Sequence, residues 1–494
     1  MPTFTSVIPR RASGVLLPVF SLPTKLDRGD FGPGAIEFLD WVARAGQRYW
    51  MTLPLGPTDS TGSPYASPSA YALDPMMVSP EILVTQGLLS SADLASLRKR
   101  LSRRQADQIR WRLLSAAYAQ WRRTCSPREA KRFVAYAKRH AGWLDSYALF
   151  AAQKVRHGQR PWWRWPVAER SPYTSKRQID ARLRSRIDFE RFVQWLAEEQ
   201  WQKIRVAAKQ RGIKIIGDLP YTVRQDSAIV WAHPELFHCR AGKLHVVGGM
   251  PPDAFAADGQ RWGTPVHDWR AHRREGYHWW TDRIRIALER TDLIRLDHFQ
   301  GYIREWTIPA HHQTARRGRW EAADGARFFP ILKKRLGRLP FIAEDLGLKL
   351  PAADSLRARL GLPGIRLFQF AWNGWPGNIH ALHHLRRDVV FMSSNHDLPP
   401  VRVWWEQHAN GYERRHLRPH LKGQPVWHVA IEQVLRSPCQ LAIVTPQDVL
   451  GLGREARINR PGTRRGNWRW HLKAGQLTPV SAQWLRQRTR AAQR

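Results

Sequence analysis

The sequence predicts a (β/α)8 (TIM) barrel, an α/β fold, with inserted and mostly helical subdomains. Eight short apolar runs rich in β-branched residues recur along the 494 residues, and each ends in polar or turn residues. Most are followed by a segment whose apolar residues lie three and four apart, which is typical of an amphipathic helix. Eight buried strands that alternate with helices favour a barrel, with a doubly wound sheet as the alternative.

Each predicted strand corresponds to one apolar run. In chain order the runs cover residues 14–22, 48–55, 214–221, 292–299, 339–346, 365–370, 388–393 and 441–445. Helical spacing is clear over residues 35–45, which follow the first run, and over residues 279–288, which precede the fourth. The chain, residues 1–494, is therefore predicted to form a single catalytic barrel.

The interval between the second and third predicted strands is much longer than the others. Residues 86–210 carry helical periodicity, with Phe189, Phe192, Val193 and Leu196 on one face. We predict that residues 86–210 form an inserted helical subdomain. Part of the basic excess of the chain lies here, and we interpret it as the solvated face of these helices.

The composition is globular but strongly basic, with 79 Lys and Arg against 41 Asp and Glu, a formal charge of +38. Such a charge indicates either affinity for polyanions or a basic surface composition, so a nucleic-acid-binding protein is a remote alternative. Only three cysteines are present, far apart in the sequence, which excludes a disulfide framework and favours a reducing, cytoplasmic location. No run of about 18 apolar residues occurs, so no membrane-spanning helix is expected.

Carboxylates stand where several predicted strands end, and reacting groups in barrels lie at those ends. They are Asp218, Asp297, Glu344, Asp345 and Asp397. Converging carboxylates suit glycosidic-bond chemistry, in which one attacks or stabilises the anomeric carbon and a second, protonated, gives its proton to the leaving oxygen. The residues alone therefore predict a carboxylate enzyme on a barrel.

The residues leave three alternatives open. Arg295 lies two positions before Asp297 and shares its face of the strand, so it keeps that carboxylate ionised as a nucleophile or forms a structural ion pair. The local pattern Asp-Leu-Pro-Pro from Asp397 by itself favours a helix N-cap. Spacing does not separate Glu344 from Asp345 as the proton donor.

Eight longer motifs, which follow one another in a fixed order along the chain, give it a specific resemblance to a known family. They are SGVLLPVFSLP (13–23), LPLGPTDSTGSPYASPSAYALDP (53–75), IIGDLPYTVRQDSAIVWAHPELF (215–237), GGMPPDAFAADGQRWGTPVHDW (248–269), IRLDHFQGY (294–302), FIAEDLG (341–347), SNHDLPP (394–400) and PQDVLGLG (446–453). The chain resembles the 4-α-glucanotransferases, also called amylomaltases or disproportionating enzymes, which are relatives of the α-amylase barrels. The resemblance extends over nearly the whole chain.

The resemblance implies a role for each matching residue. Asp297 is the expected nucleophile, Glu344 the general acid and base, and Asp397 the third carboxylate, which favours the distorted transition state. The expected substrate-binding residues are Tyr65, Asp218, Asp253, Trp262, Arg295 and His396. Without the resemblance, ordinary packing is the preferred interpretation of the two aromatic side chains among them.

The implied activity is retaining transfer of α-1,4-glucan segments from maltooligosaccharides or longer glucans to a glucan or glucose acceptor, with an α-glucan hydrolase as the alternative. No organic cofactor, metal, membrane or specific nucleic acid is expected. The spacing of His380, His383 and His384 is compatible with a metal site, but the motif contains no acid, and a solvated helix face is favoured.

Three positions depart from the family's usual pattern. Ala254 follows Asp253 where an aromatic residue is usual, and Gln300 stands where arginine is commoner. Asn373 and Gly374 follow Trp372 where an acidic residue is frequent. None of these departures affects the three carboxylates, so the chemistry is expected to be retained while the preference for chain length differs.

Overall fold

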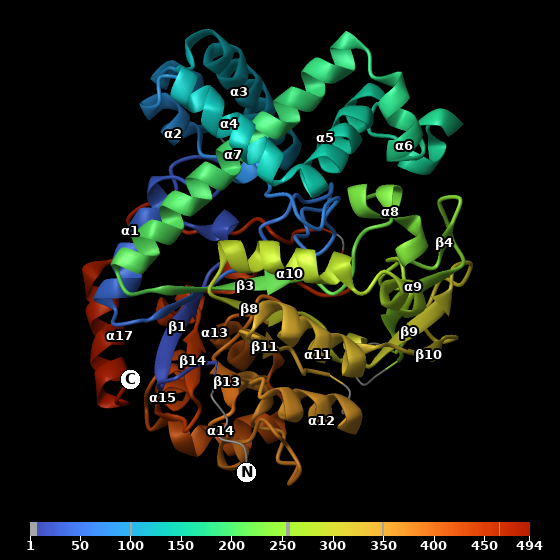
Figure 1. Ribbon diagram of the computed structural model, residues 1–494. Coiled ribbons are helices and arrows are strands. Elements are labelled where there is room, and N and C mark those ends of the chain that lie inside the picture. Colours follow the sequence, from blue (N-terminus) through green and yellow to red (C-terminus); the bar gives the residue numbers. More distant parts are fainter. Residues whose placement is uncertain (1–6, 99–100, 253–256, 348–349, 464) are drawn as a thin grey trace.

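The computed structural model describes residues 7–98, 101–252, 257–347, 350–463 and 465–494, and its centre is a parallel sheet of eight strands (Figure 1). The strands are β1 (Ala12–Leu16), β2 (Tyr49–Met51), β3 (Lys214–Leu219), β8 (Leu293–Leu296), β11 (Phe341–Ala343), β12 (Gly364–Leu367), β13 (Val389–Met392) and β14 (Leu441–Val444). Their order in the sheet is β11-β8-β3-β2-β1-β14-β13-β12. The backbone N–H of Ala343 donates to the carbonyl of Pro363 at 2.9 Å, which brings β11 beside β12 and closes the ring.

Each of the eight predicted runs overlaps one strand of this ring, with β1 and β12 beginning before their runs, so the predicted fold class is confirmed. The strands of a barrel are covered on both faces, and every residue of β1, β2, β8 and β11–β14 is buried. Alternate residues serve different cores. In β14, Leu441 and Ile443 join a cluster to which all eight strands contribute, whereas Ala442 and Val444 pack outward against the helices.

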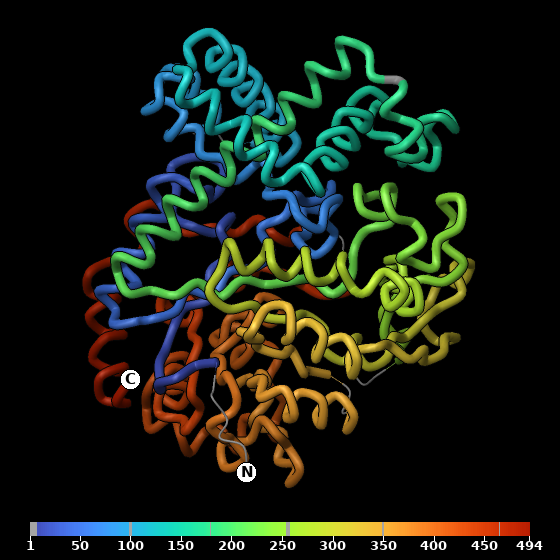
Figure 2. The backbone as a smooth tube through the Cα atoms, in the orientation of Figure 1, coloured from blue at the N-terminus to red at the C-terminus, as the bar shows by residue number. Residues whose placement is uncertain are grey.

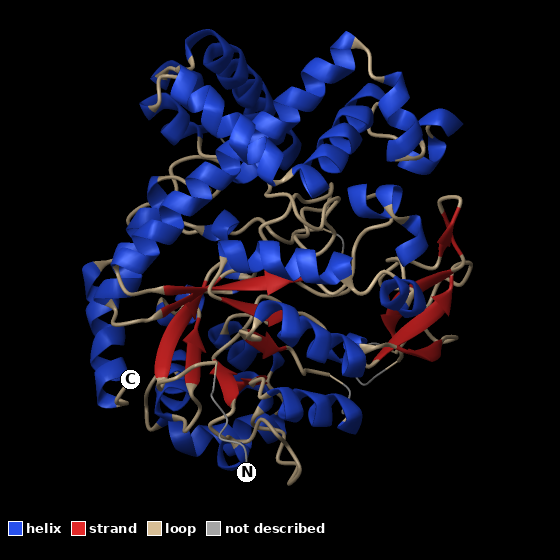
Figure 3. Ribbon diagram, viewed as in Figure 1, coloured by secondary structure: helices blue, strands red, loops and turns tan. Residues whose placement is uncertain are grey.

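Helices cover the outside of the ring (Figure 3). They include α1 (Pro33–Arg44), α10 (His278–Arg290), α11 (Gly325–Leu336), α12 (Pro351–Leu360), α15 (Val426–Arg436) and α17 (Pro479–Ala491). Further helices are α8 (Ala228–Ala232), α9 (Trp269–Arg274), α13 (Val401–Val403), α14 (Gly411–Leu421) and α16 (Pro446–Val449). The helices predicted over residues 35–45 and 279–288 correspond to α1 and α10. Helix α1 begins earlier than predicted, because Pro33 occupies its first turn, where a proline is well tolerated.

A helical region stands between β2 and β3 and occupies the top of the view in Figure 1. It contains α2 (Pro80–Thr85), α3 (Arg103–Thr124), α4 (Pro127–Arg139), α5 (Ala141–Arg156), α6 (Pro172–Ser175) and α7 (Ala181–Gln210). The tube in Figure 2 shows the chain returning to the barrel along α7. Trp201 of α7 packs on Trp50 of β2, with ring centroids 6.0 Å apart, so α7 belongs to both regions. An inserted subdomain with the limits 86–210 stays a prediction.

A second, four-stranded antiparallel sheet lies at the right of Figure 3 and was not predicted. It consists of β6 (Val246–Met250), β7 (Gln260–Arg261), β9 (Arg304–Pro309) and β10 (Arg319–Ala322), and a two-stranded ribbon joins β4 (Cys239–Arg240) to β5 (Lys243–Leu244). Its central strand β9 follows β8 after one short turn. The sheet therefore grows out of the loops that leave the carboxyl ends of the barrel strands.

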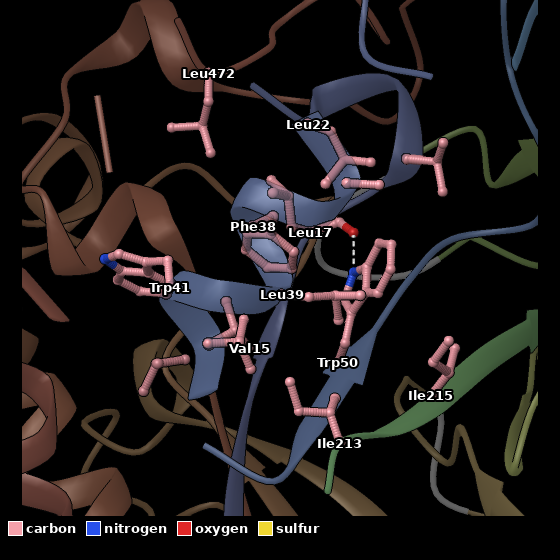
Figure 4. Close-up of a cluster of buried hydrophobic side chains, with 14 of the residues drawn as sticks. Val15, Leu17, Leu22, Phe38, Leu39, Trp41, Trp50, Ile213, Ile215 and Leu472 are labelled. Atoms are coloured by element: carbon pink, nitrogen blue, oxygen red, sulfur yellow. Dashed lines mark hydrogen bonds between the residues drawn. The ribbon is translucent and has the colours of Figure 1, made fainter. Parts of the chain in front are cut away.

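Trp50 connects the barrel to the helices around it (Figure 4). Its side chain is fully buried, and its ring lies 5.3 Å from the ring of Phe38 on α1. Its indole Nε1 donates a hydrogen bond to the backbone carbonyl of Leu17 at 2.8 Å, so the one polar atom of the side chain is satisfied.

Replacing Trp50 should destabilise the protein strongly. We expect Trp50→Ala to lower the free energy of unfolding by about 3–5 kcal/mol, because it opens a cavity between β2, α1 and α7. Trp50→Phe keeps most of the ring volume but loses the hydrogen bond to Leu17, and it should cost less, about 1–3 kcal/mol. Urea denaturation followed by circular dichroism measures both, and equal stability of the two variants would contradict this account.

Candidate active site

Arg295 lies at the centre of a carboxylate cluster inside the carboxyl end of the barrel. In the register of the sheet Asp218 of β3 stands beside Arg295 of β8, and both share the inward face with Ile216 and Leu293. Arg295 Nη1 donates to the two carboxylate oxygens of Asp218 at 2.9 and 2.8 Å and to Asp297 Oδ1 at 3.0 Å. One guanidinium group therefore holds two carboxylates in place.

Glu344 joins this cluster from the neighbouring strand. It follows β11, and Ile342 two positions earlier points into the barrel, so Glu344 faces inward as well. Its Oε2 accepts a hydrogen bond from the backbone N–H of His298 at 2.9 Å, and its Oε1 accepts one from the N–H of Leu346 at 3.0 Å. Arg295 Nη2 lies 4.0 Å from Glu344 Oε2.

The environment of Glu344 suits a proton donor. Burial, together with the negative charge of Asp297, raises the pKa of Glu344 to about 7, against the opposing effect of Arg295 and the two backbone N–H groups. A carboxyl group with a pKa near neutrality is protonated in a substantial fraction of molecules and still able to lose its proton. Glu344 can therefore act first as an acid and then as a base.

Asp345 occupies a different environment from Glu344. Its Oδ1 accepts hydrogen bonds from the N–H of Ile365 at 2.8 Å and from Arg366 Nη1 at 2.9 Å. Arg357 of α12 lies 3.3 Å away on the same side. Asp345 thus lies on the outward face among basic side chains, whereas Glu344 alone of the two reaches Arg295. The geometry separates two residues that spacing did not.

Asp397 and His396 lie on the loop that follows β13. Asn459 Nδ2 donates to Asp397 Oδ1 at 2.6 Å, and His396 Nε2 lies 3.4 Å from Asp397 Oδ2. The N-cap interpretation of Asp397 is wrong, because α13 begins only at Val401, whose N–H donates to Asp448 Oδ1 at 2.8 Å. The turn is held instead by the side chain of Asn395, which accepts from the N–H groups of residues 397 and 398.

Aromatic rings border the carboxylates on two sides. The hydroxyl of Tyr65 donates to Asp218 Oδ2 at 2.7 Å, and its ring stacks on that of His396 with centroids 5.2 Å apart. Trp468 lies 6.0 Å from both rings. On the other side Trp262 meets His298 edge-on at 4.9 Å. These rings offer flat apolar surfaces beside a polar centre.

The structure thus brings eight of the nine predicted site residues to one end of the barrel; the ninth, Asp253, lies outside the described residues. It adds Asn395, Asn459 and Trp468, to which the sequence analysis gave no role. The signal for Asn395 was its place directly before His396 in SNHDLPP. Asn459 and Trp468 are distant in sequence from the residues they contact and carried no comparable signal.

In the described part of the chain no group of three or more His, Cys, Asp or Glu residues is arranged to hold a metal ion. In the histidine group that was weighed as a ligand set, His380 Nδ1 accepts a hydrogen bond from the N–H of Leu367 at 3.1 Å, and His384 Nδ1 lies 2.8 Å from the carbonyl of Asn378. Those two nitrogens therefore make contacts with the backbone at the end of β12 and in the loop that follows it.

The closed parallel ring and the carboxylates at its carboxyl end define the class of protein, a (β/α)8-barrel enzyme. The family model described as 4-alpha-glucanotransferase matches residues 17–478. The 4-alpha-glucanotransferase of Thermus thermophilus is 38% identical and covers 98% of this chain and 99% of its own; that of Aquifex aeolicus is 37% identical, with 94% and 96% covered. The chain belongs to the 4-alpha-glucanotransferase family.

Solved structures agree with this assignment. The amylomaltase from Streptococcus agalactiae in complex with acarbose superposes with a TM-score of 0.93 at 29% identity, over 98% of this chain and 100% of that one. The amylomaltase from Corynebacterium glutamicum has a TM-score of 0.80 at 20% identity over 98% of this chain and 75% of that one, and shares the fold.

Proposed function

We propose that this protein transfers α-1,4-glucan segments between maltooligosaccharides or longer α-glucans by a retaining double displacement. Arg295 carries the proposal: it holds Asp297 beside Glu344, whose pKa is raised to about 7. A retaining enzyme needs such a pair, one carboxylate ionised for attack and one carboxyl group protonated for the leaving oxygen. The positive charge of Arg295 and the burial of Glu344 supply the two environments.

In the first step an oxygen of Asp297 attacks the anomeric carbon and the glycosidic C–O bond breaks. The proton of Glu344 goes to the leaving oxygen, so the shortened glucan departs with a free 4-hydroxyl group and a β-linked glycosyl ester remains on Asp297. In the second step the 4-hydroxyl of an acceptor glucan or of glucose attacks the same carbon. Glu344 takes its proton, and the ester bond to Asp297 breaks.

The remaining residues are proposed to bind and distort the donor. Asp397, fixed by Asn459, faces the site as the third carboxylate and would stabilise the positive charge that develops on the sugar ring. Tyr65, Asp218, Arg295 and His396 form one connected wall through hydrogen bonds, an ion pair and ring stacking, which suits the sugar beside the scissile bond.

Two further residues are proposed on the other side of the site. Trp262 would cover the sugar on the side of His298, because its ring lies edge-on against that imidazole. Asp253 is proposed as a substrate ligand on the resemblance alone. Together these residues would exclude water from the glycosyl ester.

Maltotriose distinguishes transfer from hydrolysis, the alternative activity. We expect incubation with maltotriose to yield glucose together with oligosaccharides longer than the substrate, because an acceptor sugar resolves the ester faster than water does. Chromatography of the products with a parallel assay of reducing ends measures this. Products that are all shorter than maltotriose, with a matching rise in reducing ends, would identify a hydrolase instead.

The rate of transfer should fall as the pH rises above about 7. Glu344 must carry its proton in the first step, and since its pKa is raised to about 7, the protonated fraction decreases above that pH. We expect kcat/KM for maltotriose to decline about tenfold per pH unit on that side of the profile. A profile that stays flat up to about pH 9 would contradict the assignment of Glu344.

The remote alternative, nucleic-acid binding, finds little support in the placement of the arginines. Arginines form ion pairs in many parts of the fold, for example Arg110 with Asp30 and Arg191 with Asp145, and are partly neutralised there.

No helix in the described part of the chain is long and apolar enough to cross a membrane. We propose a cytoplasmic location, which the three unpaired cysteines support.

A further inference from the structure

Two exposed aromatic side chains outside the carboxylate cluster lie on adjoining segments of the chain. The exposed aromatic side chains in the described part of the chain are Tyr173, Trp262, Trp375 and Tyr412, and Trp262 belongs to the active site. Trp375, 60% exposed, lies on the loop after β12, and Tyr412, 48% exposed, lies on α14. We call Trp375 and Tyr412 the aromatic platform.

Gly374 allows the ring of Tyr412 to lie against the loop that carries Trp375. Its φ is +67°, in the left-handed region that favours glycine, and a Cβ atom at this position would lie 2.1 Å from Cε1 of Tyr412. The ring of Tyr412 therefore lies directly against the backbone of the residue before Trp375.

The loop that carries Trp375 is held rigidly by Asn378, which is 4% exposed. Its Nδ2 donates to the carbonyl of Phe370 and to Asn373 Oδ1, both at 2.8 Å, and its Oδ1 accepts from the N–H of His380 at 2.9 Å. The N–H of Trp375 also donates to Asn373 Oδ1 at 3.1 Å. Because the loop is ordered before a ligand arrives, little conformational entropy is lost on binding.

The loop bearing Trp375 is uncharged in a strongly basic chain. From residue 367 to residue 385 the sequence contains no Lys, Arg, Asp or Glu, although the formal net charge is +38. A polyanion binds through clustered Lys and Arg side chains, which this loop lacks, although α14, which carries Tyr412, contains Arg414, Arg415 and Arg418. An exposed aromatic surface in a neutral loop suits a neutral ligand with an apolar face. The C–H face of a glucose ring is such a surface.

The position of the aromatic platform agrees with a glucan ligand. Trp375 lies eight residues beyond the carboxyl end of β12, and Tyr412 belongs to the connection that leaves the carboxyl end of β13 and also carries Asp397. The ring of Trp375 lies against Gly377 of its own loop, and the ring of Tyr412 lies against Gly374 of that loop and His416 of its own helix. A glucan chain bound at the carboxylates could extend over this end of the barrel.

We propose that the aromatic platform binds a remote segment of an α-1,4-glucan chain, outside the units at the cleavage point. This inference rests on the proposed function, because it requires that the protein act on α-glucans. The platform increases affinity for long glucans, whereas maltotriose is too short to occupy it and the carboxylates together.

The test compares Trp375→Ala and Tyr412→Ala with Tyr173→Ala, a matched control at an exposed tyrosine on α6. We expect Trp375→Ala to raise KM for amylose about fivefold, and Tyr412→Ala somewhat less, with kcat and KM for maltotriose unchanged. Trp375→Phe should recover most of the affinity, because it keeps an aromatic face. Retardation of the proteins in native gels that contain amylose measures binding without turnover, and thermal melting verifies that the variants fold.

Three results would overturn the proposal. One is equal retardation by amylose of wild type, Trp375→Ala and Tyr173→Ala. Another is a rise in KM for maltotriose as large as that for amylose, which would place Trp375 at the cleavage point. The third is a failure of Trp375→Phe to recover the affinity for amylose that Trp375→Ala loses. A wild-type protein that binds amylose but forms no transfer products would contradict the proposed function instead, so the two failures are distinguishable.

Discussion

Asp297→Ala should abolish glucan transfer, with a loss in kcat of about 10⁵-fold or more. Without this carboxylate no glycosyl ester can form, and no other carboxylate in the described site takes its place: Asp218 is fully buried on Arg295, and Asp345 faces outward among arginines. The rate of product formation from maltotriose, followed over long incubation with concentrated enzyme, measures the loss. Intact mass after mixing with α-maltotriosyl fluoride should show no adduct.

The control for this variant is Asp388→Ala. Asp388 is a carboxylate directly before β13 whose side chain is 66% exposed, and its nearest basic group is Arg357 at 3.8 Å. The control should keep wild-type rates. In Asp297→Ala, Arg295 still pairs with Asp218, so the barrel should stay folded. An Asp297→Ala protein that still forms a maltotriosyl adduct would refute the role of Asp297.

Glu344→Gln should slow transfer from glucan donors by about 10²–10⁴-fold, because glutamine cannot protonate the leaving oxygen. The variant should still react with α-maltotriosyl fluoride, since fluoride leaves without an acid. The second step then lacks a base, so the glycosyl ester accumulates. Intact-mass measurement followed by peptide mapping should find one maltotriosyl unit on Asp297.

The contrast between the two variants separates their roles. Glutamine is nearly isosteric with glutamate, so its amide can still occupy the space beside the N–H groups of His298 and Leu346. The pH dependence above neutrality should also disappear for the fluoride donor. An adduct on Asp345 or Asp397 in Glu344→Gln, or on Glu344 in Asp297→Ala, would show that the nucleophile has been misassigned.

The barrel strands could be predicted because barrel strands are buried on both faces. Runs such as that of β14 therefore consist of apolar residues that stop abruptly at a polar or turn residue. The second sheet could not be predicted in the same way. Its strand β7 has two residues, both exposed, and β6 contains Gly248 and Gly249, so neither carries a clear local pattern. Their pairing depends on contacts across long stretches of sequence.

The site shows the same division between local and distant information. Asp218, Asp297 and Glu344 could be predicted as site residues because they stand at strand ends. The ion pair between Asp218 and Arg295 could not, because these residues are 77 positions apart and meet only through the register of β3 against β8. Glu344 points inward with Ile342, two residues earlier, but the sequence alone did not show which face of this strand pointed inward, so it left Glu344 and Asp345 unseparated. Asn459 reaches Asp397 across 62 residues, and nothing local indicated this contact.

The misinterpretation of Asp397 has a physical cause. The local pattern Asp-Leu-Pro-Pro matches a helix start, and taken without the resemblance it contains no sign of the contacts with distant residues. In the folded chain Asn395 takes the role of closing the turn, and Asp448 takes the role of accepting from the first helical N–H. Both replacements leave the carboxylate of Asp397 available to the site.

The single guanidinium of Arg295 has an electrostatic consequence for the choice of substrate. Arg295 pairs with two carboxylates, those of Asp218 and Asp297, which leaves one formal negative charge uncompensated beside a Glu344 that is partly ionised at neutral pH. Arg457, whose Nη2 donates to the backbone carbonyl of Asp397 at 3.2 Å, offsets the charge of Asp397. The reaction centre therefore has a net negative charge, whereas the formal charge of the whole molecule is +38. A phosphate ester on the glucose unit entering the cleavage point would be repelled there, although the basic exterior attracts it. Phosphorylated units in a glucan should therefore stop the transfer of segments at their own position.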